Sequence, residues 1–185
     1  MKSIVIFASG KGSNADNIIS YFLKESKARV VAIFTNNAQS GAVDVAKKNH
    51  LPLVIFPKNE LESDVIINKL EIFHPDLIIL AGFLLKMPYS VISHFAGKIV
   101  NLHPSLLPKY GGKGMYGSHV HQAVLANKES ETGITIHWVN ENYDQGAIIA
   151  QYKIPISSSD GVLEVTQKVM QLEQAYFPQV ISTLL

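Results

Sequence analysis

The sequence predicts an α/β protein with a Rossmann-like, doubly wound and mostly parallel sheet, antiparallel C-terminal strands and a long C-terminal helix. Three patterns support this prediction. Continuous apolar runs alternate with amphipathic helical segments up to about residue 100, strand-like alternation follows at 134–155, and a helical pattern fills 161–185. Such alternation of apolar strands and helices is typical of a parallel sheet covered on both faces. The chain of 185 residues is expected to form one domain, over residues 1–185.

The first half contains four apolar runs that we expect to be buried strands. They cover residues 4–8, 30–34, 53–56 and 77–80, and helical patterns at 15–26, 43–49 and 61–73 separate them. Right-handed crossovers are expected between parallel strands. Because ligands bind beyond the carboxyl ends of such strands, the loops of interest are 9–14, 35–39, 81–87 and 101–110.

The second half follows a different pattern. A short strand at 99–100 precedes two further predicted strands, 134–139 and 147–155, which a polar loop at 140–146 connects. We expect these two strands to extend the sheet in the antiparallel direction. Asp160 is the predicted N-cap of the final helix, and Pro178 is expected to kink or split that helix.

Composition excludes several functions. The chain has 16 basic and 15 acidic residues, and it has no cysteine, so disulfides, thiol chemistry and cysteine-based zinc sites are excluded. The near-zero net charge disfavours nucleic acid as a partner. No apolar run reaches the roughly 18 residues of a membrane span, and the N-terminus lacks the pattern of a signal peptide. We therefore expect no nucleic-acid partner, no membrane and a cytoplasmic location.

A glycine-rich turn connects the first predicted strand to the first helix. Gly10, Gly12 and Ala15 satisfy a G-x-G-x-x-A pattern. Glycine allows close approach of a ligand to the backbone, and a helix start suits a phosphate. A dinucleotide site would also need an acidic residue after the second strand, where residues 35–37 are Thr-Asn-Asn. The turn therefore favours a phosphate monoester over NAD, and the alternative is a tight turn without a ligand.

The strongest candidate for chemistry is the pair Asn101 and His103, which follows a predicted strand on one side of the chain. An amide donor and an imidazole could stabilise a developing oxyanion and handle a proton. Asp144 is the natural partner if its loop meets this pair, since a carboxylate favours the imidazolium. The alternatives are a structural Asn–His pair and an ordinary aspartate turn.

The remaining histidines are less informative. His50, His74 and His94 flank predicted helix ends, where we expect them to be partners of the helix dipole or solvated, and His137 is expected to be structural. His119 and His121 would lie on different faces of a helix, which disfavours a zinc site, and His137 lies in a predicted strand. Glu173 is an acid on a largely apolar helical stretch, so either it faces solvent or a substrate amine uses it.

Four motifs together resemble the phosphoribosylglycinamide formyltransferase family, which comprises folate-dependent enzymes of purine synthesis, over essentially all 185 residues. The motifs are Ser9-Gly10-x-Gly12-Ser13-Asn14, Ala81-Gly82-Phe83, Asn101-x-His103-Pro104-Ser105-Leu106-Leu107-Pro108, and Gly133-x-Thr135-Ile136 continuing to Asp144-x-Gly146. The last two are specific to enzymes that use 10-formyltetrahydrofolate, whereas the glycine turn alone is weak.

The resemblance implies a reaction and a set of roles. Formyl would pass from 10-formyltetrahydrofolate to the amine of phosphoribosylglycinamide, with no metal required. Residues 1–100 would form a nucleotide-binding half, and residues 101–185 a catalytic and folate-binding half. The implied catalytic residues are Asn101, His103 and Asp144; the implied substrate-binding residues are Gly12, Ser13, Asn14 and Glu173; and the implied folate contacts are Leu84, Leu85, Lys86, Met87, Asn101, Asn140 and Glu141. Both partners would be small molecules, and the protein would be a monomer or homodimer.

Two departures from the family pattern stand out. Residues 84–87 lack an arginine that is common there, which puts folate side-chain contacts in doubt. The loop at 111–117, with four glycines in seven residues, is longer than the usual version, and we expect it to be a mobile flap beside the active site.

Other functions compete with this interpretation. A 10-formyltetrahydrofolate hydrolase usually carries an N-terminal regulatory domain, and a methionyl-tRNA formyltransferase carries a further C-terminal domain; this sequence predicts neither. A Rossmann oxidoreductase lacks its acidic residue here, and a nucleotide sensor without enzymatic activity remains an alternative.

Overall fold

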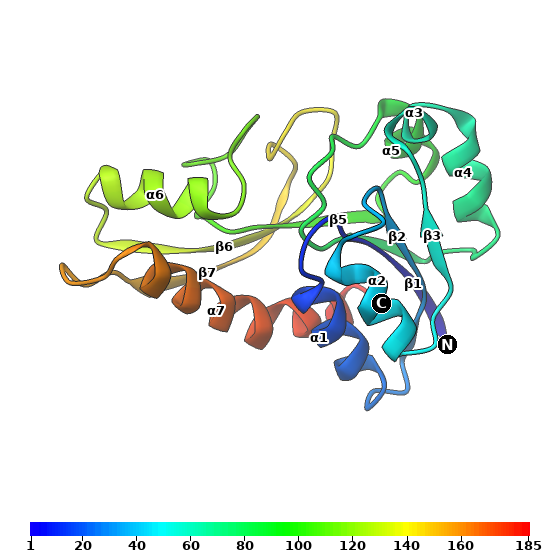
Figure 1. Cartoon of the computed structure of the whole chain (residues 1–185), viewed down its shortest axis with the longest axis horizontal. Helices are drawn as coiled ribbons and strands as arrows, with labels where there is room; N and C mark the ends of the chain where they lie inside the picture. Colours follow the sequence, from blue (N-terminus) through cyan, green and yellow to red (C-terminus); the bar gives the residue numbers. More distant parts are fainter.

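The computed structural model describes all 185 residues and contains one seven-stranded sheet with the order β3-β2-β1-β4-β5-β6-β7 (Figure 1). The strands are β1 (Lys2–Phe7), β2 (Ala28–Thr35), β3 (Leu53–Ile55), β4 (Leu77–Leu80), β5 (Ile99–His103), β6 (Glu131–Trp138) and β7 (Ile148–Pro155). Neighbours among β1–β5 pair in parallel, whereas β6 pairs antiparallel with β5 and with β7. The predicted fold class is confirmed.

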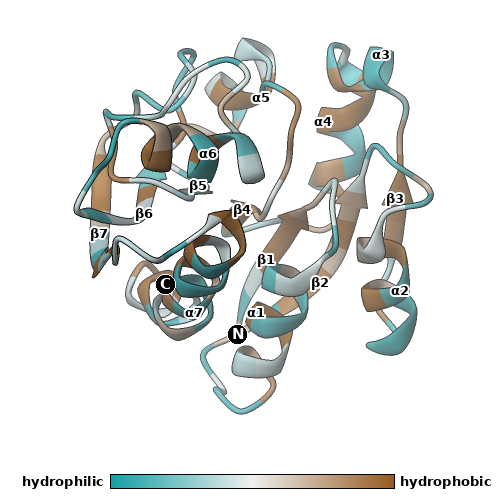
Figure 2. Ribbon diagram, turned by 60° about the vertical axis from the view of Figure 1, so that its left-hand side comes forward, coloured by the Kyte–Doolittle hydropathy of each residue, from teal (hydrophilic) through white to brown (hydrophobic).

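Helices cover both faces of the sheet. They are α1 (Ser13–Phe22), α2 (Gly41–Lys48), α3 (Lys58–Leu61), α4 (Asp64–Glu71), α5 (Tyr89–His94), α6 (Ser118–Ala126) and α7 (Val162–Thr183). One buried apolar cluster joins the sheet to α1, α2 and α7, and a second joins it to α3, α4 and α5. Figure 2 shows the corresponding pattern, with apolar strands at the centre and hydrophilic outer faces on the helices.

The central position of β1 in the sheet explains why its residues 4–7 are all apolar. Ile4 and Ile6 belong to the first cluster, while Val5 and Phe7 belong to the second, and all four are fully buried. Successive side chains of a strand point to opposite faces. A strand in the middle of a doubly covered sheet therefore needs apolar residues at every position.

The strand order reverses between β1 and β4. The chain passes from β1 to β2 on one side, then returns from β3 to β4 on the other side of β1. The backbone N–H of Ser9 donates to Gly82 O at 3.1 Å, which holds the two diverging loops together at their start. Such a switch point is where open α/β sheets bind ligands.

Several predicted boundaries were wrong. The helix α1 ends at Phe22 rather than near residue 26, and the pattern at 61–73 divides into α3 and α4. The N-cap of α7 is Gly161, not Asp160, because the Glu164 side chain accepts from Gly161 N at 2.9 Å. The helix α7 is not split and continues through the buried Pro178. The helices α5 and α6 had no counterpart in the sequence prediction. None of the helices combines the length and apolar character that a membrane span requires.

Candidate active site

The end of β5 positions two of the proposed catalytic residues. Asn101 and His103 are alternate residues of β5, so they project to the same face of the sheet. Antiparallel pairing places His137 of β6 opposite Asn101. The Nδ2 of Asn101 lies 3.0 Å from His137 Nε2, and His137 Nδ1 lies 2.9 Å from Trp138 O. Since a carbonyl only accepts, Nδ1 of His137 carries the proton and Nε2 accepts from Asn101.

Asp144 meets this pair, as the sequence analysis expected if the loops came together. It lies between β6 and β7, and its Oδ2 accepts from Gly112 N at 2.8 Å and lies 3.5 Å from His103 Nδ1. Its Oδ1 lies 3.5 Å from Asn101 Nδ2 and 3.7 Å from His137 Nε2. The side chain of Asp144 is only 11% exposed. One buried carboxylate therefore contacts two imidazoles and one amide.

His103 is fixed from both sides. Its Nε2 donates to the carbonyl of Tyr110 at 2.7 Å, and its Nδ1 faces Asp144. Burial lowers the pKa of His103 below its usual value, while Asp144 and the Tyr110 carbonyl act in the opposite direction without reversing the shift. Acceptors at both nitrogens suit an imidazolium, but burial opposes the charge.

Asp144 itself stays ionised. Burial alone would raise the pKa of Asp144, but a hydrogen bond from His137 and the charge of His103, when these imidazoles are protonated, and the Gly112 N–H together hold that pKa below its usual value. The site therefore contains a permanent carboxylate beside a buried imidazole at neutral pH.

A buried polar network supports the loop that carries the Tyr110 carbonyl. Thr135 Oγ1 donates to Ser105 O at 2.6 Å and accepts from Leu107 N at 3.0 Å. Gln151 Nε2 donates to Leu107 O at 2.9 Å. Sequence reasoning did not find Thr135 or Gln151 as supporting residues, and it assigned His137 a structural role only. The signal it lacked was the register of β6 with its two neighbours, which places His137 opposite Asn101 of β5 and Gln151 of β7 opposite Thr135.

The glycine-rich turn forms the start of α1. Gly12 is its N-cap, in the left-handed conformation with φ 79°. Asn14 Nδ2 donates to Glu173 Oε2 of α7 at 2.8 Å, and α1 and α7 lie side by side (Figure 1). Burial raises the pKa of Glu173, and the Asn14 hydrogen bond partly opposes this change. Glu173 is therefore not a solvent-facing acid, because it lies against the turn.

The predicted folate contacts other than Asn101 lie in two loops, at 84–87 and 140–146. Leu84 is exposed, and Leu85 is partly buried. Lys86 Nζ lies 5.7 Å from the centre of the Tyr143 ring, which links the 84–87 and 140–146 loops. Met87 is only 3% exposed and packs in the second apolar cluster, so its side chain is not available to a ligand.

The polar loop between β6 and β7 is organised by one of its predicted folate contacts. Asn140 accepts from Asn142 N at 3.0 Å and donates to Gln145 O at 3.2 Å. Glu141 is exposed. Asn140 therefore shapes the loop that carries Asp144.

The glycine-rich loop at 111–117 lies beside the active site. Gly112 donates its N–H to Asp144, and Met115 N donates to Gly112 O at 3.1 Å. Lys113 between them is exposed. The mobility expected of this loop stays a prediction.

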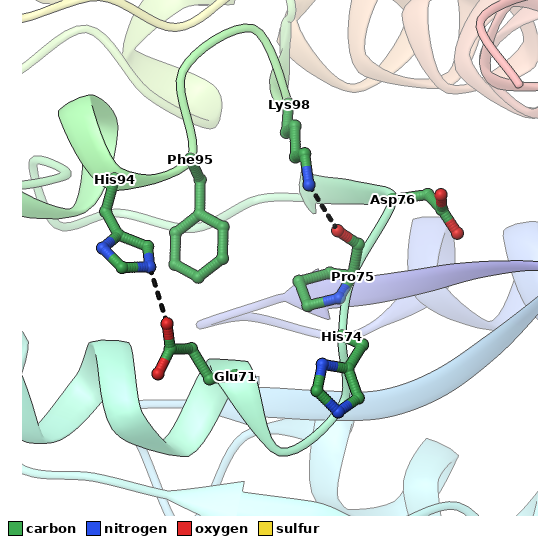
Figure 3. A pocket seen from close by; sticks show the side chains of 7 residues that line it. All are labelled: Glu71, His74, Pro75, Asp76, His94, Phe95 and Lys98. Carbon is green, nitrogen blue, oxygen red and sulfur yellow. Dashed lines mark hydrogen bonds and ion pairs between the residues drawn. The ribbon is translucent and has the colours of Figure 1, made fainter.

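The structure also contains two cavities. One, of about 270 Å³, is at the amino end of β4, opposite the catalytic edge, and two pairs of its lining residues are hydrogen-bonded (Figure 3). There, His94 Nε2 lies 2.8 Å from Glu71 Oε1, and Lys98 Nζ donates to Pro75 O at 3.4 Å. The other, of about 280 Å³, lies behind the loop at 106–110.

The doubly wound sheet carries an amide, imidazoles and a carboxylate at its carboxyl edge, with a glycine turn at the switch point. This arrangement is typical of an α/β enzyme with a small-molecule site. More particularly, the chain belongs to the formyl transferase family, whose sequence pattern matches residues 2–181. The resemblance that the four motifs predicted is confirmed.

Comparisons of sequence and structure with known proteins support this family assignment. The chain is 34% identical to the phosphoribosylglycinamide formyltransferase of Escherichia coli (strain K12), over 97% of this chain and 85% of that protein. It is 36% identical to the chloroplastic phosphoribosylglycinamide formyltransferase of Vigna unguiculata over 99% of this chain, but spans only 61% of that protein's length. It spans 65% of the corresponding Arabidopsis thaliana protein. The crystal structure of glycinamide ribonucleotide transformylase 1 from Geobacillus kaustophilus superimposes with a TM-score of 0.90 at 30% identity, over 100% of this chain and 99% of that one.

Proposed function

We propose that the chain transfers a formyl group from 10-formyltetrahydrofolate to the amine of phosphoribosylglycinamide, in purine biosynthesis. Relatives that carry this enzyme's name support the proposal, including those of Escherichia coli and Bacillus subtilis. The observation that carries it is the convergence of Asn101, His103 and Asp144 at the carboxyl edge of the sheet, the edge at which the turn at 10–14 also lies. Both partners are then small molecules.

The three side chains suit the chemistry of this transfer. When the amine attacks the formyl carbon, a new C–N bond forms and negative charge develops on the formyl oxygen. As this oxyanion collapses, the bond from the formyl carbon to the folate nitrogen breaks, and the proton lost by the amine must reach that nitrogen. The Asn101 amide and a protonated His103 can donate to that oxygen. Asp144, which stays ionised, favours the imidazolium and can receive the proton through water.

In this proposal, His103 must change partners when substrate binds. Both of its nitrogens face acceptors of the chain itself, Tyr110 O and Asp144 Oδ2. Donation to a substrate oxygen therefore requires one of these contacts to open. The Tyr110 carbonyl belongs to the loop that leads into the 111–117 segment, so ordering of that segment over substrate is the expected trigger.

The ribonucleotide would bind along the α1 side of the site. The N–H groups of Gly12, Ser13 and Asn14 would hold its phosphate, since they lie at a helix start. Glu173, held by Asn14 at 2.8 Å, would accept from the glycinamide end. No metal takes part in this scheme.

The folate would bind between the loops at 84–87 and 140–146. The exposed Leu84 and the half-exposed Tyr143 offer apolar surface to an aromatic ring system, and the backbone around the exposed Leu84 and Lys86 would make contacts that do not need an arginine. The plant relatives are named chloroplastic, so the cytoplasmic location expected from the sequence stays a prediction.

Initial rates of deformylation test this proposal against a 10-formyltetrahydrofolate hydrolase. Purified protein would be mixed with 10-formyltetrahydrofolate, with and without phosphoribosylglycinamide, and the His103→Ala variant would serve as the control. Turnover that depends on the ribonucleotide and is abolished in the variant is expected. Equal turnover without the ribonucleotide would favour the hydrolase and contradict the proposal.

A further inference from the structure

The first residue of α2, Gly41, packs directly against the glycine-rich turn. A Cβ at this position would lie 2.2 Å from Lys11 O, 2.7 Å from Lys11 C and 3.1 Å from Lys11 Cα. The first two distances are shorter than any normal contact with a backbone atom. Gly41 is not among the residues with positive φ, so its conformation is open to any amino acid. Glycine is therefore required here for close approach and not for backbone geometry.

The contact is reciprocal. A Cβ at Gly12 would lie 3.1 Å from Ala42 N and 3.0 Å from a methyl group of Val45. Residues 11–12 and 41–42 thus fit against each other with no space for a side chain on either side. Because glycine is among the poorest helix formers, its presence in α2 needs such a reason.

The turn and α2 are both anchored. Ser9 N donates to Gly82 O at 3.1 Å before the turn, and Asn14 Nδ2 donates to Glu173 Oε2 at 2.8 Å after it. At the start of α2, Ser40 Oγ lies 3.0 Å from Thr35 Oγ1 at the end of β2. At its other end, Lys48 Nζ lies 2.9 Å from Asp16 Oδ2 of α1. Its inner residues are buried in the first apolar cluster, whereas Lys11 is exposed. A methyl group added at Gly41 would therefore force the turn and the start of α2 apart.

We propose that Gly41 is a positioning residue for the phosphate of the ribonucleotide. Its missing side chain lets Lys11 and Gly12 sit close to α2, which sets the position of the N–H groups at the start of α1. Gly41 does not touch the substrate and acts only through the turn. This role rests on the proposed function, since that function assigns the phosphate to the turn.

Binding measurements separate this role from a general structural one. Calorimetric titration with ribose 5-phosphate would compare the wild type with Gly41→Ala, and a folate analogue without a transferable formyl group would be titrated in parallel. Gly41→Ala is expected to weaken ribose 5-phosphate binding at least tenfold and to change folate-analogue binding less than twofold. Lys47→Ala, an exposed change on the same helix, is the matched control and should bind both probes as the wild type does.

Three results would overturn the proposal in distinguishable ways. Unchanged ribose 5-phosphate binding by Gly41→Ala would remove the role of Gly41 alone. Equal weakening of both probes would show a general structural effect instead. Failure of the wild type to bind ribose 5-phosphate would overturn the phosphate assignment itself.

A measurement on the wild type covers the case in which Gly41→Ala does not fold. The backbone amide signals of Gly41 and Ala42 would be followed by NMR during titration with ribose 5-phosphate. They are expected to shift together with those of Lys11 and Gly12, because the two segments are in contact. Shifts at the turn without any at Gly41 and Ala42 would contradict the proposal.

Discussion

Replacing Asn101 by alanine removes the amide that the proposed mechanism uses as an oxyanion donor. Loss of one such donor typically lowers kcat by about 10²–10³, which corresponds to about 2.7–4 kcal/mol of transition-state stabilisation. Because a donor of this kind acts mainly in the transition state, the KM values for both substrates should change little. Steady-state kinetics with each substrate varied in turn would measure both effects.

The same substitution also has a structural effect that must be separated from catalysis. The amide lies 3.0 Å from Nε2 of His137, whose side chain is only 3% exposed, so Asn101→Ala leaves a buried acceptor unpaired. Such a loss costs about 1–3 kcal/mol, and each 1 kcal/mol lowers Tm by roughly 2–4 °C in a domain of this size. Thermal unfolding should therefore show a lower Tm with the fold retained at assay temperature.

Asn101→Asp provides a second test of the donor role. It keeps the shape of the side chain, removes both donor hydrogens and brings a second carboxylate near Asp144, whose Oδ1 lies 3.5 Å from Asn101 Nδ2. We expect at least as large a loss of kcat as in Asn101→Ala. If either variant is folded and keeps more than about half of the wild-type kcat, the donor role is wrong.

Four further predictions concern the rest of the site. Asp144→Asn should reduce turnover and lower the pKa of His103 further, since the carboxylate is what favours the imidazolium; an unchanged NMR titration of His103 would refute this coupling. Burial lowers the pKa of His103 in the folded chain, so the unfolded chain binds a proton at His103 first as the pH falls below about 6.5. The free energy of unfolding should therefore decrease as the pH falls through this range, and denaturant titrations at several pH values would measure it. Gly12→Val should raise the ribonucleotide KM more than the folate KM, but it also strains a residue whose φ is 79°. Gly10→Ala adds a methyl group that has no other atom within 4 Å, so it should raise the ribonucleotide KM without lowering Tm. A larger effect on the folate KM would contradict the phosphate assignment. Trypsin should cleave after Lys113 rapidly in the free protein and slowly with both substrates' analogues bound; equal resistance in both states would remove the flap.

The parts of the fold that the sequence predicted are those in which local pattern and tertiary environment agree. The runs that became β1 and β4 are apolar at every position because both faces of those strands are covered. The helix α5 has only six residues, Tyr89–His94, which is too short for a helical period to be evident. The division between α3 and α4 depends on Ser63, whose hydroxyl accepts from Val65 N at 3.4 Å.

The site was predictable only where its residues are close in sequence. Asn101 and His103 share one face because they alternate along a single strand. The meeting of Asp144 with His103, and of Glu173 with Asn14, depends on how distant segments pack, which no local pattern contains. His137 was assigned a structural role because its position opposite Asn101 follows from strand register rather than from its own neighbours.

The fate of the formyl carbon tests the central claim most directly. 10-Formyltetrahydrofolate labelled with ¹³C in the formyl group would be incubated with the purified protein and phosphoribosylglycinamide, and the products would be followed by ¹³C NMR. The account predicts that the label appears in the N-formyl group of the ribonucleotide, and that Asn101→Ala slows its appearance by about 10²–10³. Label that accumulates as free formate, with or without the ribonucleotide, would contradict it.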